Sequence, residues 1–165
     1  MVGSRTIWLV ATTLGCAVGW EPNPTMHYHL KIDPSFSVEE AQAITDAATA
    51  WQAQSGSYVT FDANPRAPSD VISFTRGTWF EMSREFDGSL GESIYDGQST
   101  HIVIYEGLDL TTFTQTVTHE IGHAIGLVHT GPGTIMCKDS ICATLVITCA
   151  DIQQLERRTT TKECP

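Results

Sequence analysis

The sequence is poor in basic residues and contains no repeat of its own. Its 165 residues include 9 Lys and Arg against 19 Asp and Glu, which gives a formal net charge of -10. A chain with so few cations offers no basic stripe for binding phosphates, so we expect no nucleic-acid partner. Anionic membrane surfaces are disfavoured for the same reason. The acidic surface favours solubility and would tolerate calcium or basic partners.

No interdomain linker divides the chain either. A length of 165 residues with 41% hydrophobic composition is enough to build one core. We therefore expect residues 20–165 to form a single, monomeric globular domain.

The first 19 residues have a composition of their own. Arg5 gives a positive start, and mostly apolar or small residues follow from position 7 to 18. This run is too short and too interrupted by Thr and Gly to span a bilayer, whereas an export signal has this outline. Cleavage before Trp20 would release a secreted protein. Alternatively, Cys16 follows Leu-Gly as in a bacterial lipoprotein signal and would be lipid-anchored at the cell envelope; a buried strand in a cytosolic protein is the third interpretation.

The cysteines lack the close CxxC spacing that structural zinc sites favour. Apart from Cys16, four cysteines gather toward the C-terminus, namely Cys137, Cys142, Cys149 and Cys164. An even number in an exported chain predicts two disulfides, and the three pairings that four cysteines allow stay open.

Two elements are predicted near the start of the domain. Apolar residues alternate with polar ones from Met26 to Ile32, which predicts a half-buried strand with His27 and His29 on its exposed polar face. Ser37 followed by Glu40 forms a capping box, and apolar residues then recur at helical spacing. We expect a long amphipathic helix that ends near Gly56.

Further β-rich runs at 58–61, 71–74 and 101–105 predict strands of one mixed sheet. Thr148 with Asp151 matches a second capping box and opens a final helix towards Arg158. Between positions 85 and 97, two Asp-Gly pairs flank Glu92. These are turn signals first, and a calcium site is the alternative, although the EF-hand spacing is absent.

The chemistry is concentrated in residues 119–129, which read HEIGHAIGLVH and match the pattern HExxHxxGxxH. On a helix, residues four apart lie on one face, so His119 and His123 can present two imidazoles to one ion. The apolar residues Phe113, Val117, Ile121 and Ile125 mark the opposite, core-facing side.

Gly126 falls one turn after the second histidine, where the helix must stop and the backbone must reverse. That reversal lets His129 return as a third ligand. Three protein ligands leave a fourth position for water, which is the arrangement of a catalytic zinc site. In this hypothesis zinc activates the water and Glu120 takes its proton and returns it to the leaving amine.

With these residues the chain resembles the metzincin metallopeptidases, which pair this motif with a methionine turn beneath the zinc. Gly133-Thr134-Ile135-Met136 supplies the matching turn. Within the clan it looks most like the matrixins, through Ala47 to Trp51, Asp70-Val71-Ile72 and Leu90-Gly91. Thr130 and Cys137 depart from the animal pattern, and no cysteine-switch segment is present, so the chain resembles a minimal, bacterial catalytic domain.

The resemblance implies an α+β metzincin or zincin fold. It consists of a twisted mixed sheet with two long helices, a small irregular lower subdomain and a C-terminal helix. A protein or peptide substrate would lie across the cleft, pairing with an edge strand near 90–95. The pocket beyond the scissile bond would be walled by residues 131–146. The implied protein is a secreted zinc endopeptidase with one catalytic Zn²⁺.

Two alternatives and one gap remain. The first alternative is a non-catalytic, zinc-stabilised secreted binding module, which would not need Glu120. The second is a zinc hydrolase that acts on a non-peptide amide, which the resemblance to the metzincins disfavours. The groups that orient the histidines are required in principle. Asp139 and Asp151 are the candidates that the sequence offers.

Overall fold

The computed structural model describes residues 26–56, 58–62, 67, 70–78, 89–138 and 144–159, with side chains described up to residue 155. The elements in these ranges are β1 (Met26–Ile32), α1 (Val38–Gln54), β2 (Val59–Phe61), β3 (Val71–Gly77), β4 (Gly91–Tyr95), β5 (Thr100–Tyr105), α3 (Leu110–Ala124) and α4 (Cys149–Thr159). The predicted signal at 1–19 with Cys16, and also Asp139, Cys142 and Cys164, lie outside the described residues.

The strands form one five-stranded sheet in the order β2-β1-β3-β5-β4. All neighbours pair in parallel except β4 and β5, which are antiparallel. The predicted mixed sheet is therefore confirmed, and so is the edge strand near 90–95, because within this sheet β4 pairs with β5 alone. The strand predicted at 71–74 runs on to Gly77, since polar Thr75 and Arg76 still pair with β5.

The expectation that His27 and His29 are exposed is wrong, because β1 lies inside the sheet between β2 and β3. Both histidines are half-buried. His27 Nδ1 lies 2.7 Å from Thr60 Oγ1 and 3.0 Å from a carboxylate oxygen of Asp62. The predicted alternation itself holds, since the apolar residues of β1 pack against the core.

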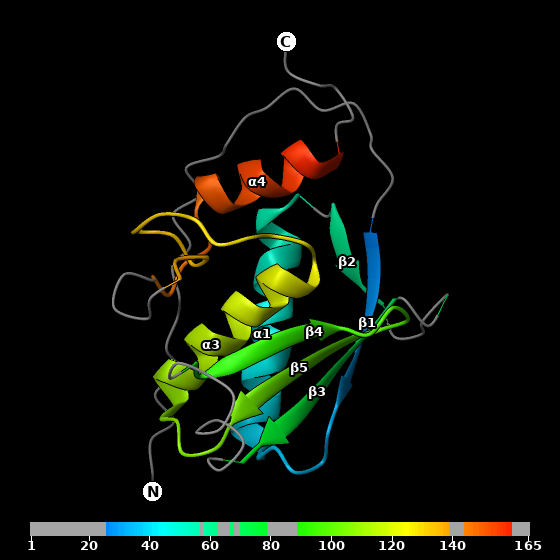
Figure 1. Cartoon of the computed structure of the whole chain (residues 1–165), viewed down its shortest axis with the longest axis vertical. Helices are drawn as coiled ribbons and strands as arrows, with labels where there is room; N and C mark the ends of the chain where they lie inside the picture. Colours follow the sequence, from blue (N-terminus) through cyan, green and yellow to red (C-terminus); the bar gives the residue numbers. More distant parts are fainter. Residues whose placement is uncertain are drawn as a thin grey trace, which may run out of the picture.

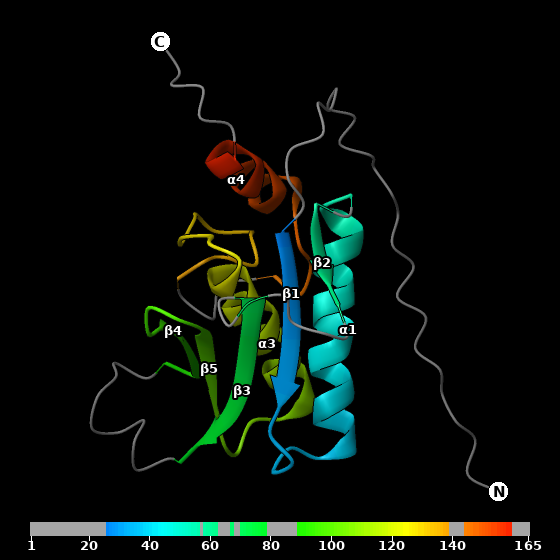
Figure 2. The same cartoon turned by 90° about the vertical axis from the view of Figure 1, so that its right-hand side faces the viewer.

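Helices α1 and α3 lie side by side on one face of the sheet, as Figure 1 and the turned view in Figure 2 show. The predicted capping box is present at the start of α1, where Ser37 Oγ accepts from the backbone of Glu40 and the Glu40 carboxylate accepts from Ser37. Trp51 is fully buried and donates from Nε1 to the carbonyl of Thr118, 2.9 Å away. This bond ties α1 to the middle of α3.

In the described residues between α3 and α4, namely 125–138 and 144–148, the chain forms no regular element, and α4 lies at one end of the molecule, beyond the sheet (Figure 1). This is the small lower subdomain and C-terminal helix that the sequence predicted. Cys137 and Cys149 are not free thiols, but Cys142 and Cys164 are not described, so the pairing stays a prediction. None of the helices in the described ranges is long and apolar enough to cross a membrane.

Candidate active site

Helix α3 carries the first half of the site. Its N-cap is Asp109, whose carboxylate accepts from the backbone amides of Thr111 and Thr112 at 2.9 and 3.1 Å. The predicted core stripe is buried, and its members are Phe113, Val117, Ile121 and Ile125. Burial of this stripe fixes the rotation of the helix, so the opposite side faces away from the core.

The helix ends where the sequence predicted. Gly126 has a φ of 100°, which residues with a Cβ rarely adopt. The amide of Leu127 then donates to the carbonyl of Gly122 at 2.8 Å, and the chain turns back toward the helix. This reversal brings His129 over the two histidines of α3.

The three histidines converge at their Nε2 atoms. Nε2 of His129 lies 3.2 Å from Nε2 of His119 and 3.1 Å from Nε2 of His123. Ligands about 2.0–2.1 Å from a tetrahedral zinc ion are themselves roughly 3.3 Å apart. The spacing therefore suits one small ion held by all three rings, and together they form a group that could hold a metal.

Backbone carbonyls set the tautomers of two of these rings. Nδ1 of His119 lies 2.8 Å from the carbonyl oxygen of Ile135, and Nδ1 of His123 lies 2.9 Å from that of Leu127. A carbonyl only accepts, so each Nδ1 donates, and each neutral ring points an Nε2 lone pair at the shared point. Lone pairs so close together repel unless a cation lies between them.

The electrostatics keep both helical rings neutral and ready to bind. Burial lowers the pKa of His119 to about 4, against an opposing contribution from its bond to Ile135. Burial also lowers the pKa of His123. Metal ligation needs deprotonated imidazole, so the rings have the required form at neutral pH.

Glu120 is buried beside the histidines, with 6% of its surface exposed. Its Oε2 has no hydrogen-bond partner although it is sealed from solvent. Burial, with a further contribution from the charge of Glu92, raises the pKa of Glu120 to about 8. An orphaned carboxyl oxygen is costly in a stable interior, which marks this group as held ready for a ligand or a proton.

Met136 lies beneath the helix that carries the histidines and is fully buried. It packs against Gly122, where an added Cβ would lie 2.3 Å from the Met136 sulfur and 3.1 Å from Trp51 Cζ2. The glycine inside the motif is therefore required by close packing. The sequence pointed to Met136 but gave no reason for Gly122.

Asp151 of α4 supports the segment around Met136. Its carboxylate, fully buried, accepts from the amide and hydroxyl of Thr148 at 2.8 and 2.7 Å and lies 3.4 Å from the amides of Ile135 and Met136. Asp151 thus acts on His119 through the backbone, because Ile135 provides the carbonyl that holds that ring, and its charge also acts in the direction that raises the pKa of His119. The Thr148 hydroxyl donates to Asp151, and its carbonyl accepts the amide of that residue.

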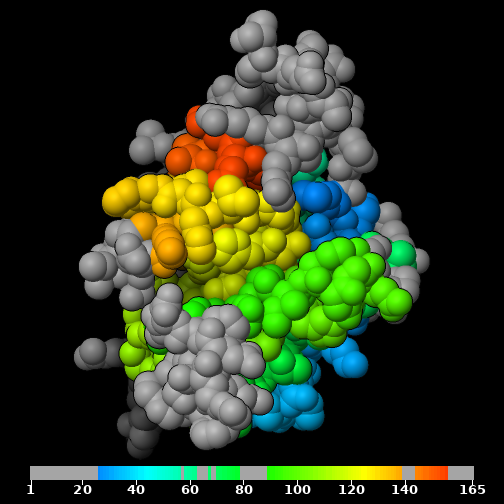
Figure 3. All heavy atoms as spheres, viewed as in Figure 1, coloured from blue at the N-terminus to red at the C-terminus, as the bar shows by residue number. Residues whose placement is uncertain are grey.

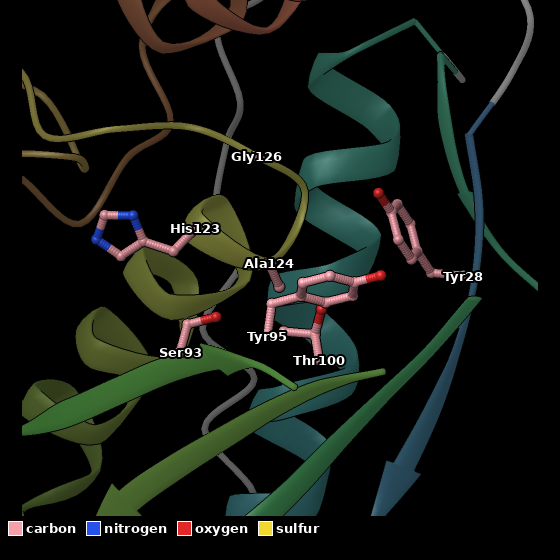
Figure 4. Close-up of a pocket in the computed structure, with 7 residues that line it drawn as sticks. All are labelled: Tyr28, Ser93, Tyr95, Thr100, His123, Ala124 and Gly126. Carbon is pink, nitrogen blue, oxygen red and sulfur yellow. The ribbon is translucent and has the colours of Figure 1, made fainter. Parts of the chain in front are cut away.

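A pocket of about 380 Å³ adjoins His123. Figure 4 shows His123 at one end and Tyr28 at the other, with the ring of Tyr95 between them below the end of α3. Ala124 and Gly126 also line it, and they add little bulk. In Figure 3 the segment after α3, in yellow, faces β4, in green, across a shallow furrow. The pocket is therefore bordered both by His123 and by Ser93 and Tyr95 of the edge strand β4.

Comparison with known proteins identifies the fold. No protein-family model and no curated protein matches the chain. Archaemetzincin from Methanopyrus kandleri has a similar structure, with a TM-score of 0.50 at 16% identity, covering 81% of this chain and 94% of that one. The fold is thus of the metzincin type, a mixed α+β zincin architecture.

A second similar structure is high choriolytic enzyme 1, a hatching-enzyme zinc protease from the medaka fish Oryzias latipes. Its TM-score is 0.46 at 19% identity, and the match covers 64% of this chain. The aligned part is 46% of the hatching enzyme, so this chain spans less than half of that protein's length.

The carbonyls of Ile135 and Leu127, and the tyrosines of the pocket, were not predicted. Backbone carbonyls have no signature in residue type, and Tyr28 and Tyr95 stand on strands where an aromatic residue is ordinary. Of the two aspartates predicted to orient the histidines, Asp151 lies near the site and Asp139 is outside the described residues.

Proposed function

We propose that this protein is a zinc-dependent endopeptidase in which His119, His123 and His129 hold the metal and Glu120 is the general base. The observation that carries the proposal is the convergence of three Nε2 atoms beside a buried carboxyl oxygen that has no partner. A structural metal site would need the histidines but not that carboxyl group. The finer assignment to the matrixins and to bacteria belongs to the same proposal and rests on the sequence motifs.

The donor set fits zinc, because neutral imidazole nitrogens at tetrahedral spacing are its usual ligands. When bound, zinc supplies Lewis-acid polarisation of a carbonyl and lowers the pKa of water. Glu120, whose ionised form would be favoured by a cation held by the three histidines, would accept a proton from the attacking water at its unpartnered oxygen and deliver it to the nitrogen of the leaving amine. His119 and His123 stay aligned through these steps because carbonyls hold their Nδ1 atoms.

A peptide chain is the substrate that suits the remaining surface. Strand β4 lies at the edge of the sheet and can pair with an extended peptide backbone. Gly91 brings this strand close to α3, since an added Cβ there would lie 3.2 Å from Cγ of Glu120. A peptide on β4 would therefore pass the carboxyl group, and the pocket with Tyr28 and Tyr95 would receive one of its side chains.

The decisive experiment compares the parent with Glu120→Ala on a library of peptides and denatured proteins, with bound zinc quantified in each. Loss of a general base costs about 10²–10⁴ in rate, while the three histidines should still hold zinc. Glu39→Ala, at an exposed position of α1, is the matched control and should cleave like the parent.

Equal cleavage by the parent and Glu120→Ala would refute the role of the glutamate. A folded, zinc-loaded parent that cleaves nothing would favour the binding module, and activity confined to non-peptide amides would favour the other hydrolase. The cleaved sequences would also show which side chain enters the pocket at Tyr95.

Export is a further part of the proposal. Residues 1–19 would direct the chain out of the cytoplasm, either as a cleaved signal or with a lipid on Cys16. Cys137, Cys142, Cys149 and Cys164 would then pair in two disulfides. Mass spectrometry of the mature protein, intact and after proteolysis without reduction, would identify the N-terminus, any lipid and the pairing.

A further inference from the structure

The three histidines are not held in the same way. Nδ1 of His119 and Nδ1 of His123 each bond a backbone carbonyl. Within the described residues, the ring of His129 has no polar neighbour at hydrogen-bonding distance other than the Nε2 atoms of His119 and His123. It is also the one exposed member of the group. The direction of its Nε2 must therefore be set through its backbone.

The residue before His129 is gripped by a side chain from α4. Gln154 Nε2 donates to the carbonyl of Val128 at 3.0 Å, and the amide of Val128 donates back to Gln154 Oε1. One carboxamide thus satisfies both backbone groups of a single residue, as a neighbouring strand would. Val128 is 56% exposed, so burial of its side chain does not hold this segment.

The residue after His129 is fixed as well. The amide of Thr130 donates to the carbonyl of Met136 at 2.8 Å. Gln154 and Met136 therefore anchor the chain on the two sides of His129, and only one residue's worth of backbone freedom lies between the anchors.

Helix α4, which carries Gln154, is itself anchored in the core. Ile152 and Leu155 are buried in the core, and Asp151 is fully buried against the segment that contains Ile135. Residues 151 and 154 are three apart and so lie on the same side of the helix. The same turn of α4 supports both the carbonyl that holds His119 and the backbone that carries His129.

We propose that Gln154 is a positioning residue for the metal centre, and that its carboxamide aims His129 at the point shared with His119 and His123. This inference rests on the proposed metal site. It gives α4 a part in metal retention, because a ligand on an exposed, irregular segment is only as well placed as the groups that hold it.

The test replaces Gln154 with Met, which keeps the length of the side chain and removes both hydrogen bonds. Gln153→Met, at the exposed neighbouring position, is the matched control. Zinc affinity is measured by competition with a chromophoric chelator, and the visible spectrum of the cobalt-substituted protein reports ligand geometry. Thermal unfolding of the metal-free proteins shows whether the fold has changed.

We expect Gln154→Met to bind zinc about 10-fold more weakly and to alter the cobalt spectrum, with metal-free unfolding like that of the control. Gln154→Glu, which places an oxygen against the Val128 carbonyl, should weaken zinc binding too. Parent-like zinc affinity in both variants would overturn the inference while leaving the proposed peptidase intact. A loss explained by lower metal-free stability would overturn it as well, and a parent that binds no zinc would remove the metal site itself.

Discussion

The two walls of the site are built by different means. On one wall, α3 places His119, Glu120 and His123 by the regular geometry of a single helix whose core stripe is buried. On the other, residues 127–138 follow no regular element, and hydrogen bonds from α4 and from their own backbone hold them. Local periodicity is enough for the first wall, whereas the second depends on residues 15 to 26 positions away in sequence.

The two walls also differ in how many of their features lower the stability of the fold. The helical wall keeps a buried, unpartnered carboxyl group and a glycine inside a helix, both of which are unfavourable for stability. The irregular wall instead satisfies its buried carboxylate with several donors. The destabilising features of the site therefore lie on α3, where the hydrogen bonds of a regular helix and its buried stripe compensate for them.

The largest effect should come from Glu120→Gln in the metal-free protein. Burial raises the pKa of Glu120 to about 8, above the value of about 4.3 in an unfolded chain. The folded state thus binds the proton more tightly, so stability is fully present below the unfolded pKa and is lost as pH rises towards 8. Glutamine does not titrate, so this loss should disappear.

The difference amounts to about 3–4 kcal/mol between pH 5 and pH 8. Denaturant unfolding at the two pH values, in the presence of a chelator, measures it for the parent, Glu120→Gln and the exposed control Glu39→Gln. Burial lowers the pKa of His119 to about 4, so the contribution of His119 to the stability of the fold is lost as pH falls. This contribution is the same in the parent and in both variants. A parent with the same pH profile as Glu120→Gln would show that the helical wall bears no such cost.

The second effect should come from Asp151→Asn, on the irregular wall. The Thr148 amide and hydroxyl both donate to Oδ2 of Asp151, and asparagine can keep that one acceptor, but its NH₂ group cannot accept from the Met136 amide and the charge is lost. Hydrogen bonds to a charged group are worth about 1.5–3 kcal/mol. We expect a loss of about 2 kcal/mol, with faster hydrogen exchange at the amides of Ile135 and Met136 than in α3. The control is Asp46→Asn, at an exposed position. Equal acceleration along α3 would mean that the walls are not independent.

What the sequence could predict follows the same division. The helix with its stripe from Phe113, the stop at Gly126 and strands β1, β2, β3 and β5 come from periodic or local signals, and the structure confirms them. The edge strand β4 was expected only from the resemblance. The exposed position expected for His27 was wrong, because alternation shows which residues share a face but not whether the strand lies inside the sheet.

The support of the site could be predicted only in part. Asp151 was a candidate, and the sequence also predicted its capping box with Thr148, but its contact with Ile135 depends on the fold. Gln154 gave no signal, because a glutamine on an exposed helix is ordinary until its partner is known. Such contacts join residues that are distant in sequence, and no local pattern records them.

The smallest effect should come from Gly122→Ala, where the two walls meet. An added Cβ would lie 2.3 Å from the Met136 sulfur, and overpacking of this kind costs about 1–3 kcal/mol. Alanine recovers up to about 1 kcal/mol through its helix propensity, so the net loss should be near 1 kcal/mol. Gly131→Ala, where an added Cβ meets no atom within 4 Å, is the control for unfolding in denaturant.

If Gly122→Ala is as stable as the parent, then the side chain of Met136 moves aside easily and the two walls are not packed as one unit. A loss confined to Gly122→Ala would mean instead that the irregular wall, although held by distant residues, fixes the position of Met136 closely enough to exclude one methyl group.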